Sequence, residues 1–76
     1  MANRELFGSS HCPHTQDMRE WLEGRGCDFV EYDVEADAEA RQRFKSLPGT
    51  PHTVPVLVED GKVVQVGWRG QGCMVV

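Results

Sequence analysis

The sequence predicts an α/β fold with the order β-α-β-α-β-β, in which helices pack on a four-stranded mixed sheet. The first two strand segments are separated by a helical segment, which is typical of parallel strands joined by a right-handed crossover. The last two strand segments flank Asp60-Gly61, a strong hairpin signal between β-branched runs. Because the chain has only 76 residues, we expect a single domain over residues 1–76 with a modest core.

The first half of the chain contains two strand segments with a helical segment between them. Arg4–Gly8 is expected to be the first strand, and a polar loop leads from it to a helix over His14–Gly24. Apolar residues at i, i+3 and i+4 should share the buried face of this helix: Met18, Trp21 and Leu22. Asp28–Val34 carries aromatic and β-branched residues and is expected to be the second strand.

The second half begins with another helix and ends with the hairpin. We expect this helix to begin at Asp33 or Glu35, as a solvated acidic start, and to end before Pro48-Gly49. Its buried face is expected to contain Ala36, Ala40, Phe44 and Leu47. A loop rich in Pro and Thr then leads to two strands, Pro55–Glu59 and Lys62–Val66.

Charge and composition exclude several classes of function. The net charge is −4 and no basic stripe is present, so nucleic-acid binding is not expected. No apolar run is long enough to cross a bilayer, and no signal peptide is visible, so we expect a cytoplasmic protein without membrane contact. Three cysteines do not suit a fully paired disulfide framework, and in a reducing compartment cysteines are more often catalytic or metal-binding.

Cys12 is the strongest candidate for a reactive residue. It stands where the first helix begins, and Pro13 suits the first helical position. A helix N-terminus favours an anion, so the pKa of a thiol there should fall. The residue three positions later, where many redox motifs carry a second cysteine, is Thr15.

Three motifs in this order resemble those of the glutaredoxins and of the short redoxins that serve ribonucleotide reductase. The motifs are Cys12-Pro13-His14-Thr15, Thr53-Val54-Pro55 and Gly67-Trp68-Arg69. The resemblance covers nearly the whole chain and implies a thioredoxin-like fold with the final helix short or absent. It also implies a thiol–disulfide oxidoreductase involved in electron transport, with a cis bond before Pro55.

The resemblance assigns roles to the motif residues. Cys12 would be the nucleophile. From its own chemistry, the Thr15 hydroxyl is expected to donate a hydrogen bond to the Cys12 thiolate. Glutathione, the expected co-substrate, or a protein disulfide would pair with Val54 as an added strand. The expected substrate-binding residues are Pro13, His14, Thr53, Val54, Pro55, Gly67, Trp68 and Arg69.

Departures from the family pattern leave the mechanism open. Ser9 replaces a lysine that binds a carboxylate of glutathione, and Arg69 is a candidate to supply that charge. Since Thr15 lacks a thiol, a monothiol exchange is expected, in which a second thiol frees Cys12. Cys73 is either an internal resolving cysteine or a thiol in a frayed tail.

Further predictions concern the remaining cysteine, the histidines and metal binding. Cys27 is expected to be a buried small hydrophobe. His11, His14 and His52 either tune the Cys12 thiol or are exposed loop residues. We expect a monomer without a bound cofactor or metal. The alternative from another class is a non-enzymatic carrier of a metal or an iron–sulfur cluster that uses Cys12 as a ligand.

Overall fold

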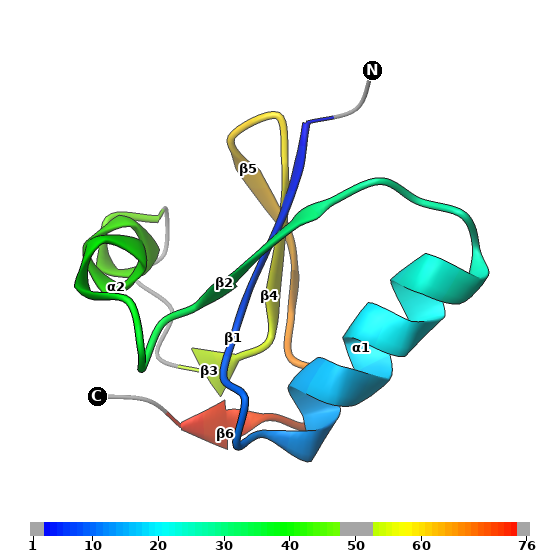
Figure 1. The fold of residues 1–76 in the computed structure, drawn as a ribbon, viewed down its shortest axis with the longest axis horizontal. Helices are drawn as coiled ribbons and strands as arrows, with labels where there is room; N and C mark the ends of the chain where they lie inside the picture. The colour runs from blue at the N-terminus through cyan, green and yellow to red at the C-terminus, as the bar shows by residue number, and fades with distance from the viewer. Residues whose placement is uncertain (1–2, 48–52, 75–76) are drawn as a thin grey trace.

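A four-stranded mixed sheet forms the centre of the fold, as the sequence predicted (Figure 1). The structure is a computed structural model that describes residues 3–47 and 53–74. Its main sheet has the order β2-β1-β4-β5 and consists of β1 (Arg4–Gly8), β2 (Val30–Asp33), β4 (Val56–Glu59) and β5 (Lys62–Val66). β1 runs parallel to β2, whereas β4 is antiparallel to both β1 and β5.

The hairpin between β4 and β5 turns at the predicted dipeptide. Asp60 and Gly61 both have positive φ angles, 53° and 79°. Positive φ at both central residues defines the type I′ turn that two-residue hairpins favour, and Asp-Gly suits it best. The turn therefore pairs β5 with β4, and the strand order makes β5 an edge strand of the sheet.

Two helices cover opposite faces of the sheet (Figure 1). α1 (Pro13–Gly24) lies on one face, and α2 (Ala38–Lys45) lies on the other. Because side chains alternate along a strand, neighbouring residues of β1 enter different cores. Leu6 packs with Met18 and Leu22 of α1, whereas Phe7 packs with Phe44 of α2. Among the described residues, no helix is long and apolar enough to cross a membrane.

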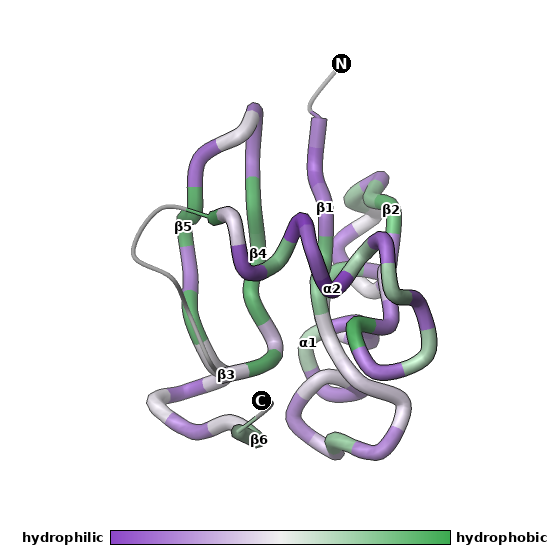
Figure 2. Tube along the Cα trace, turned by 90° about the vertical axis from the view of Figure 1, so that its left-hand side faces the viewer, coloured by the Kyte–Doolittle hydropathy of each residue, from purple (hydrophilic) through white to green (hydrophobic). Residues whose placement is uncertain are grey.

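Hydropathy along the chain matches this two-sided burial (Figure 2). Val56, Leu57 and Val58 of β4 are at most 4% exposed, because β4 lies between β1 and β5 and is covered on both faces. Burial alternates along β5, so that Val63 and Gln65 are partly buried while Val64 and Val66 are half exposed at the sheet edge.

The second helix begins later than the sequence predicted. Asp33 and Glu35 are both outside α2, which begins at Ala38 with Asp37 as its N-cap. The Asp37 side chain accepts hydrogen bonds from the backbone N–H groups of Glu39 and Ala40, which fixes the helix start there. Ala36, expected on the buried face, is exposed in the preceding turn.

Other boundaries also differ from the prediction. β2 begins at Val30, which is 54% exposed, so the strand is shorter than Asp28–Val34. α2 ends at Lys45 with Ser46 as its C-cap, and the predicted helix stop at Pro48-Gly49 lies outside the described residues. Trp21 was expected in the core but is 40% exposed, with its ring against Trp68.

Two short strands were not predicted. β3 (Thr53–Val54) falls in the segment expected to be a loop, and it pairs antiparallel with β6 (Cys73–Met74) near the C-terminus. The partners are Thr53 with Met74 and Val54 with Cys73. Two residues are too few to show a periodic pattern, so neither strand was visible in the sequence.

The contact between Gly8 and Thr15 gives a prediction on stability. A Cβ at residue 8 would overlap the Thr15 methyl group and come within 2.8 Å of its Oγ1. We expect Gly8→Ala to lower the free energy of unfolding by about 1–3 kcal/mol, the usual cost of overpacking. Urea unfolding followed by circular dichroism measures it.

Two further variants control for this prediction. Thr15→Ala added to Gly8→Ala should recover part of the loss, because it removes the overlapping methyl group. Gly24→Ala, which meets nothing within 4 Å, should not destabilise the protein. A Gly8→Ala protein as stable as the parent would show that the turn can move.

Candidate active site

Cys12 is the N-cap residue of α1. Its backbone is extended, with φ −100° and ψ 115°, and Pro13 follows at the start of the helix. The Cys12 carbonyl oxygen accepts hydrogen bonds from the N–H groups of Thr15 at 3.1 Å and Gln16 at 3.3 Å. A helix N-terminus favours an anion, and in the disulfide-bonded structure Cys12 is only 3% exposed. The predicted placement of Cys12 at the helix start is therefore confirmed.

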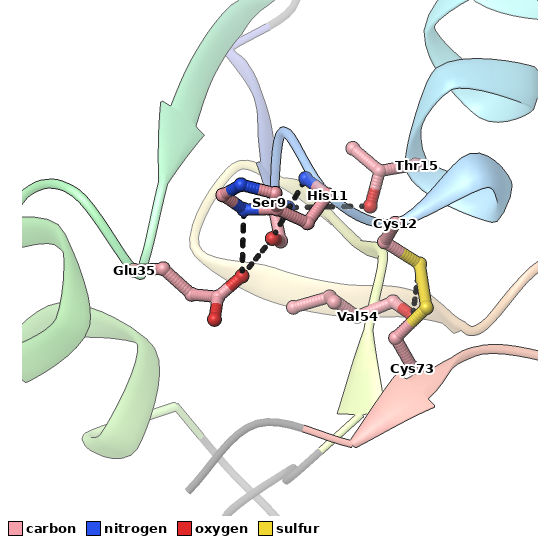
Figure 3. The surroundings of a disulfide bond; sticks show 7 residues. All are labelled: Ser9, His11, Cys12, Thr15, Glu35, Val54 and Cys73. Carbon is pink, nitrogen blue, oxygen red and sulfur yellow. Dashed lines mark hydrogen bonds and ion pairs between the residues drawn. A yellow bond between two sulfur atoms is a disulfide. The ribbon is translucent and has the colours of Figure 1, made fainter.

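A disulfide joins Cys12 to Cys73 of β6 (Figure 3). The two Cα atoms are 5.9 Å apart, within the usual range for disulfides, although 61 positions separate them in the sequence. Cys73 is thus not in a frayed tail, which was one of the two expectations for it. Thr15 holds the position of a second motif cysteine, and the sulfur bonded to Cys12 belongs to Cys73 in β6 instead.

Val54 and Pro55 form the wall of the site opposite α1. The peptide bond between them is cis, as the sequence resemblance implied. The Val54 carbonyl oxygen lies 3.9 Å from the Cys12 sulfur (Figure 3). The Pro55 carbonyl oxygen accepts a hydrogen bond from Gly67 N–H at 2.7 Å, so the end of β5 is tied to the same segment.

The Thr15 side chain bonds to the loop before Cys12. It is fully buried, and its Oγ1 accepts a hydrogen bond from Ser9 N–H at 3.3 Å (Figure 3). Among residues 3–47 and 53–74, no hydrogen bond joins this hydroxyl to the Cys12 sulfur. In this structure Thr15 instead packs beneath Gly8 and holds the turn between β1 and α1.

The Glu35 carboxylate, predicted from the sequence to be solvated, approaches the loop before Cys12. Ser9 Oγ donates a hydrogen bond to Glu35 Oε1, and His11 Nδ1 lies 3.8 Å from the same oxygen (Figure 3). His11 N–H donates to Ser9 Oγ at 3.1 Å. Ser9 and Glu35 are 26 positions apart, so no local pattern linked them. The position where the family has a lysine is thus paired here with a negative group.

Trp68 and Arg69 lie in a tight turn between β5 and β6. Trp68 N–H donates to the Gln71 carbonyl at 2.6 Å, and Gln71 N–H donates back at 2.9 Å. The Trp68 ring packs against the core on the α1 side and meets Trp21 edge-on at 5.7 Å. Arg69 is exposed, with its guanidinium 5.5 Å from the Trp68 ring. The Trp68 ring thus packs against the core, and its expected contact with substrate stays a prediction.

The remaining candidates lie apart from the disulfide or outside the described residues. Cys27 is a free, partly buried thiol packed against the core on the α1 side, as expected of a small hydrophobe. His14 is partly buried at the start of α1, and His52 lies outside the described residues. In the part of the chain that the structure describes, no three His, Cys, Asp or Glu residues gather in a way that could hold a metal ion.

The sequence matches that of an established family over most of its length. The family is Glutaredoxin, and the match covers residues 5–64. The chain is also 28% identical over 60 residues to an uncharacterized glutaredoxin-like 8.6 kDa protein in the rubredoxin operon of Clostridium pasteurianum, which is 79% of each chain.

Solved structures share the fold. A crystal structure of a single-residue variant of the thioredoxin-like protein BC3987 superposes with a TM-score of 0.79 and 30% identity, covering 91% of this chain and 86% of that one. The glutaredoxin grx-1 from Archaeoglobus fulgidus gives a TM-score of 0.73 and 30% identity, covering 91% and 78%. These similarities confirm the thioredoxin-like fold.

Asp33 gives a prediction on pH dependence. Burial raises the pKa of its carboxyl, but hydrogen bonds from the N–H groups of Glu35 and Ala36 and from Ser10 outweigh burial and lower it. A carboxyl whose pKa is lowered by folding stabilises the protein above its unfolded pKa, about 3.9, and loses that effect as the pH falls through the folded value.

We therefore expect Asp33→Asn to be less stable than the parent near neutral pH, with a difference that shrinks below about pH 4. Urea unfolding at a series of pH values measures the difference. The Ser10 N–H donates to Asp33 at 3.4 Å, so this carboxylate also holds the loop before Cys12. A difference that stays constant down to pH 2 would contradict the electrostatic explanation.

Proposed function

The chain belongs to the glutaredoxin family, and from that premise we propose that it is a thiol–disulfide oxidoreductase whose nucleophile is Cys12. The observation that carries the proposal is the disulfide between Cys12, at the N-terminus of α1, and Cys73 in β6. It supports a cycle in which this pair alternates between dithiol and disulfide.

In the first step the Cys12 thiolate attacks one sulfur of a substrate disulfide. A bond forms between Cys12 and that sulfur, the substrate S–S bond breaks, and the other half leaves as a thiolate. The helix N-terminus assists by stabilising the attacking anion. Val54 and Pro55 lie opposite, where the extended backbone of the substrate would bind.

In the second step a thiolate frees Cys12 from the mixed disulfide. In the monothiol route an external thiol such as glutathione attacks the substrate sulfur and regenerates the Cys12 thiolate. In the internal route Cys73 attacks the Cys12 sulfur, the substrate leaves as a thiolate, and the protein is left oxidised by two electrons. Two external thiols then reduce the Cys12–Cys73 disulfide. The close approach of Cys73 to Cys12 favours the internal route.

A glutathione mixed disulfide tests the nucleophile. We expect Cys12→Ser to lower its turnover at least about 10³-fold, because a hydroxyl does not form a nucleophilic anion at neutral pH. Cys27→Ser, at a free thiol packed against the core, serves as the matched control and should retain most of the activity. Turnover by Cys12→Ser at the parental rate would refute the proposed function.

Cys73→Ser separates the two routes of release. If Cys73 resolves the mixed disulfide, this variant should accumulate a protein–substrate adduct that mass spectrometry detects at a stoichiometry near one. Turnover should then require added thiol in proportion to its concentration. If the external route operates alone, Cys73→Ser should turn over as fast as the parent and accumulate no more adduct.

Glu35 is expected to oppose anionic substrates. Glutathione carries a net negative charge, and the Glu35 carboxylate is half exposed and bonded to Ser9 beside the loop before Cys12. We expect Glu35→Gln to raise kcat/KM for a glutathione mixed disulfide by about two- to fivefold at low salt, an effect that salt should screen. A neutral mixed disulfide of mercaptoethanol is the control, and an equal gain with it would show that charge is not the cause.

A further inference from the structure

The edge of β3 beside Cys12 is already occupied by the protein's own chain. β6 pairs antiparallel with β3, so that Val54 faces Cys73, and the Cys73 sulfur is bonded to Cys12. This combination of a strand paired at Val54 and a sulfur joined to the nucleophile is the arrangement that an extended peptide substrate would adopt in a mixed disulfide. Figure 3 shows Cys73 beside Val54 and its disulfide bond to Cys12.

Gly72, which precedes Cys73, lies too close to β3 for any side chain. A Cβ at residue 72 would overlap Thr53 Cγ2 and come within 2.5 Å of the Val54 carbonyl oxygen. Gly72 is not among the residues with positive φ, so space and not backbone conformation excludes a side chain there. One of the two overlapping atoms, the Val54 carbonyl oxygen, belongs to the backbone and so cannot move away by a side-chain rotation.

The turn before β6 holds this strand in register. Gly67 has a φ of 81°, and a Cβ there would lie 2.8 Å from the Gln71 carbonyl oxygen. The paired hydrogen bonds between Trp68 and Gln71 close the turn, and the Trp68 ring anchors it to the core on the α1 side. The turn over residues 67–71 thus fixes the positions of Gly72 and Cys73 beside β3.

We propose that β6 is a tethered substrate analogue, and that the β3 edge selects peptide or protein disulfides in which glycine directly precedes the reacting cysteine. The inference rests on the proposed function and adds a substrate class to it. A substrate strand that pairs with Val54 in the same direction meets the same two obstacles that surround Gly72. Residues 72–74 and the substrate therefore compete for one edge.

The chemistry in the two cases is the same exchange. The Cys12 thiolate attacks the cysteine sulfur of the bound peptide, the peptide's S–S bond breaks, and the departing group leaves as a thiolate with the electron pair. When Cys73 later attacks the Cys12 sulfur, β6 takes the edge and the peptide departs as a thiolate. Strand exchange and disulfide exchange thus occur at one place.

Two peptides that differ in one residue test the preference for glycine before the reacting cysteine. The probes are acetyl-Gln-Gly-Cys-Met amide, which repeats the chain's own sequence at 71–74, and the same peptide with Ala in place of Gly, each as a mixed disulfide with thionitrobenzoate. The Cys73→Ser protein reacts with each, and released thionitrobenzoate is followed by absorbance. We expect the Gly peptide to react about tenfold faster, as the steric overlap requires. Free glutathione, which has no strand edge, should react equally with both.

A second comparison tests the competition. In the chain that keeps Cys73, Gly72→Ala should slow closure of the Cys12–Cys73 disulfide about tenfold, since Ala does not fit against β3. In the Cys73→Ser background, the same substitution should speed capture of the Gly peptide, because it removes the tethered competitor. Gly24→Ala, with open space around it, should change neither rate.

The outcomes separate the inference from the function. Equal rates for the two peptides, or a Gly72→Ala change that slows closure and capture alike, overturn the inference. If neither peptide reacts while the glutathione mixed disulfide still does, the inference fails and the proposed function stands. If Cys12 reacts with no disulfide, the proposed function itself fails. The peptide pair needs only Cys73→Ser, so the test holds even where Gly72→Ala does not fold.

Discussion

The pairing of β3 with β6 is the contact on which the arrangement of the site depends. It places Cys73 opposite Val54 and next to the N-terminus of α1, and the disulfide then joins the first helix to the last described strand. The main sheet makes this possible, because β4 continues from the cis Val54–Pro55 bond and β5 returns to Gly67 at the Pro55 carbonyl. The β3–β6 pairing, the cis bond and the Gly67–Pro55 hydrogen bond all involve backbone close to the disulfide. A substitution that shifts any of them should therefore move the sulfur atoms.

The residues around the motif are arranged for packing as much as for chemistry. Thr15 fills the space under Gly8, where a larger residue on β1 has no room. Ser9 uses its hydroxyl to link the loop before Cys12 to Glu35, and Asp33 holds Ser10 from the end of β2. Thr15 of α1 and the segment 33–35 at the end of β2 therefore both hold the loop that presents Cys12.

The sequence predicted the four long strands, both helices and the place of Cys12, because each of these shows in periodicity, turn residues or a family motif. The Asp-Gly turn and the cis bond before Pro55 were predicted for the same reason. The start of α2 was wrong, since several acidic residues can cap a helix and only the structure shows that Asp37 does. β3, β6 and the Ser9–Glu35 link were missed because each depends on residues far apart in sequence, where local patterns carry no signal.

Moving the second sulfur from the helix to a strand changes what oxidation does to the protein. With two cysteines on one helix, a disulfide forms without using the strand edge beside the nucleophile. Here the disulfide and the pairing of β6 with β3 are present together. In the proposed cycle, the oxidised protein has its edge filled and its nucleophile bonded, whereas reduction frees the nucleophile and leaves β6 to compete with the substrate for the edge. Because linked equilibria are reciprocal, whatever stabilises β6 on β3 also favours the disulfide, and a substrate that takes the edge favours the reduced state. In the proposed cycle, redox state and substrate binding are thus coupled through the two-residue pairing of β3 with β6.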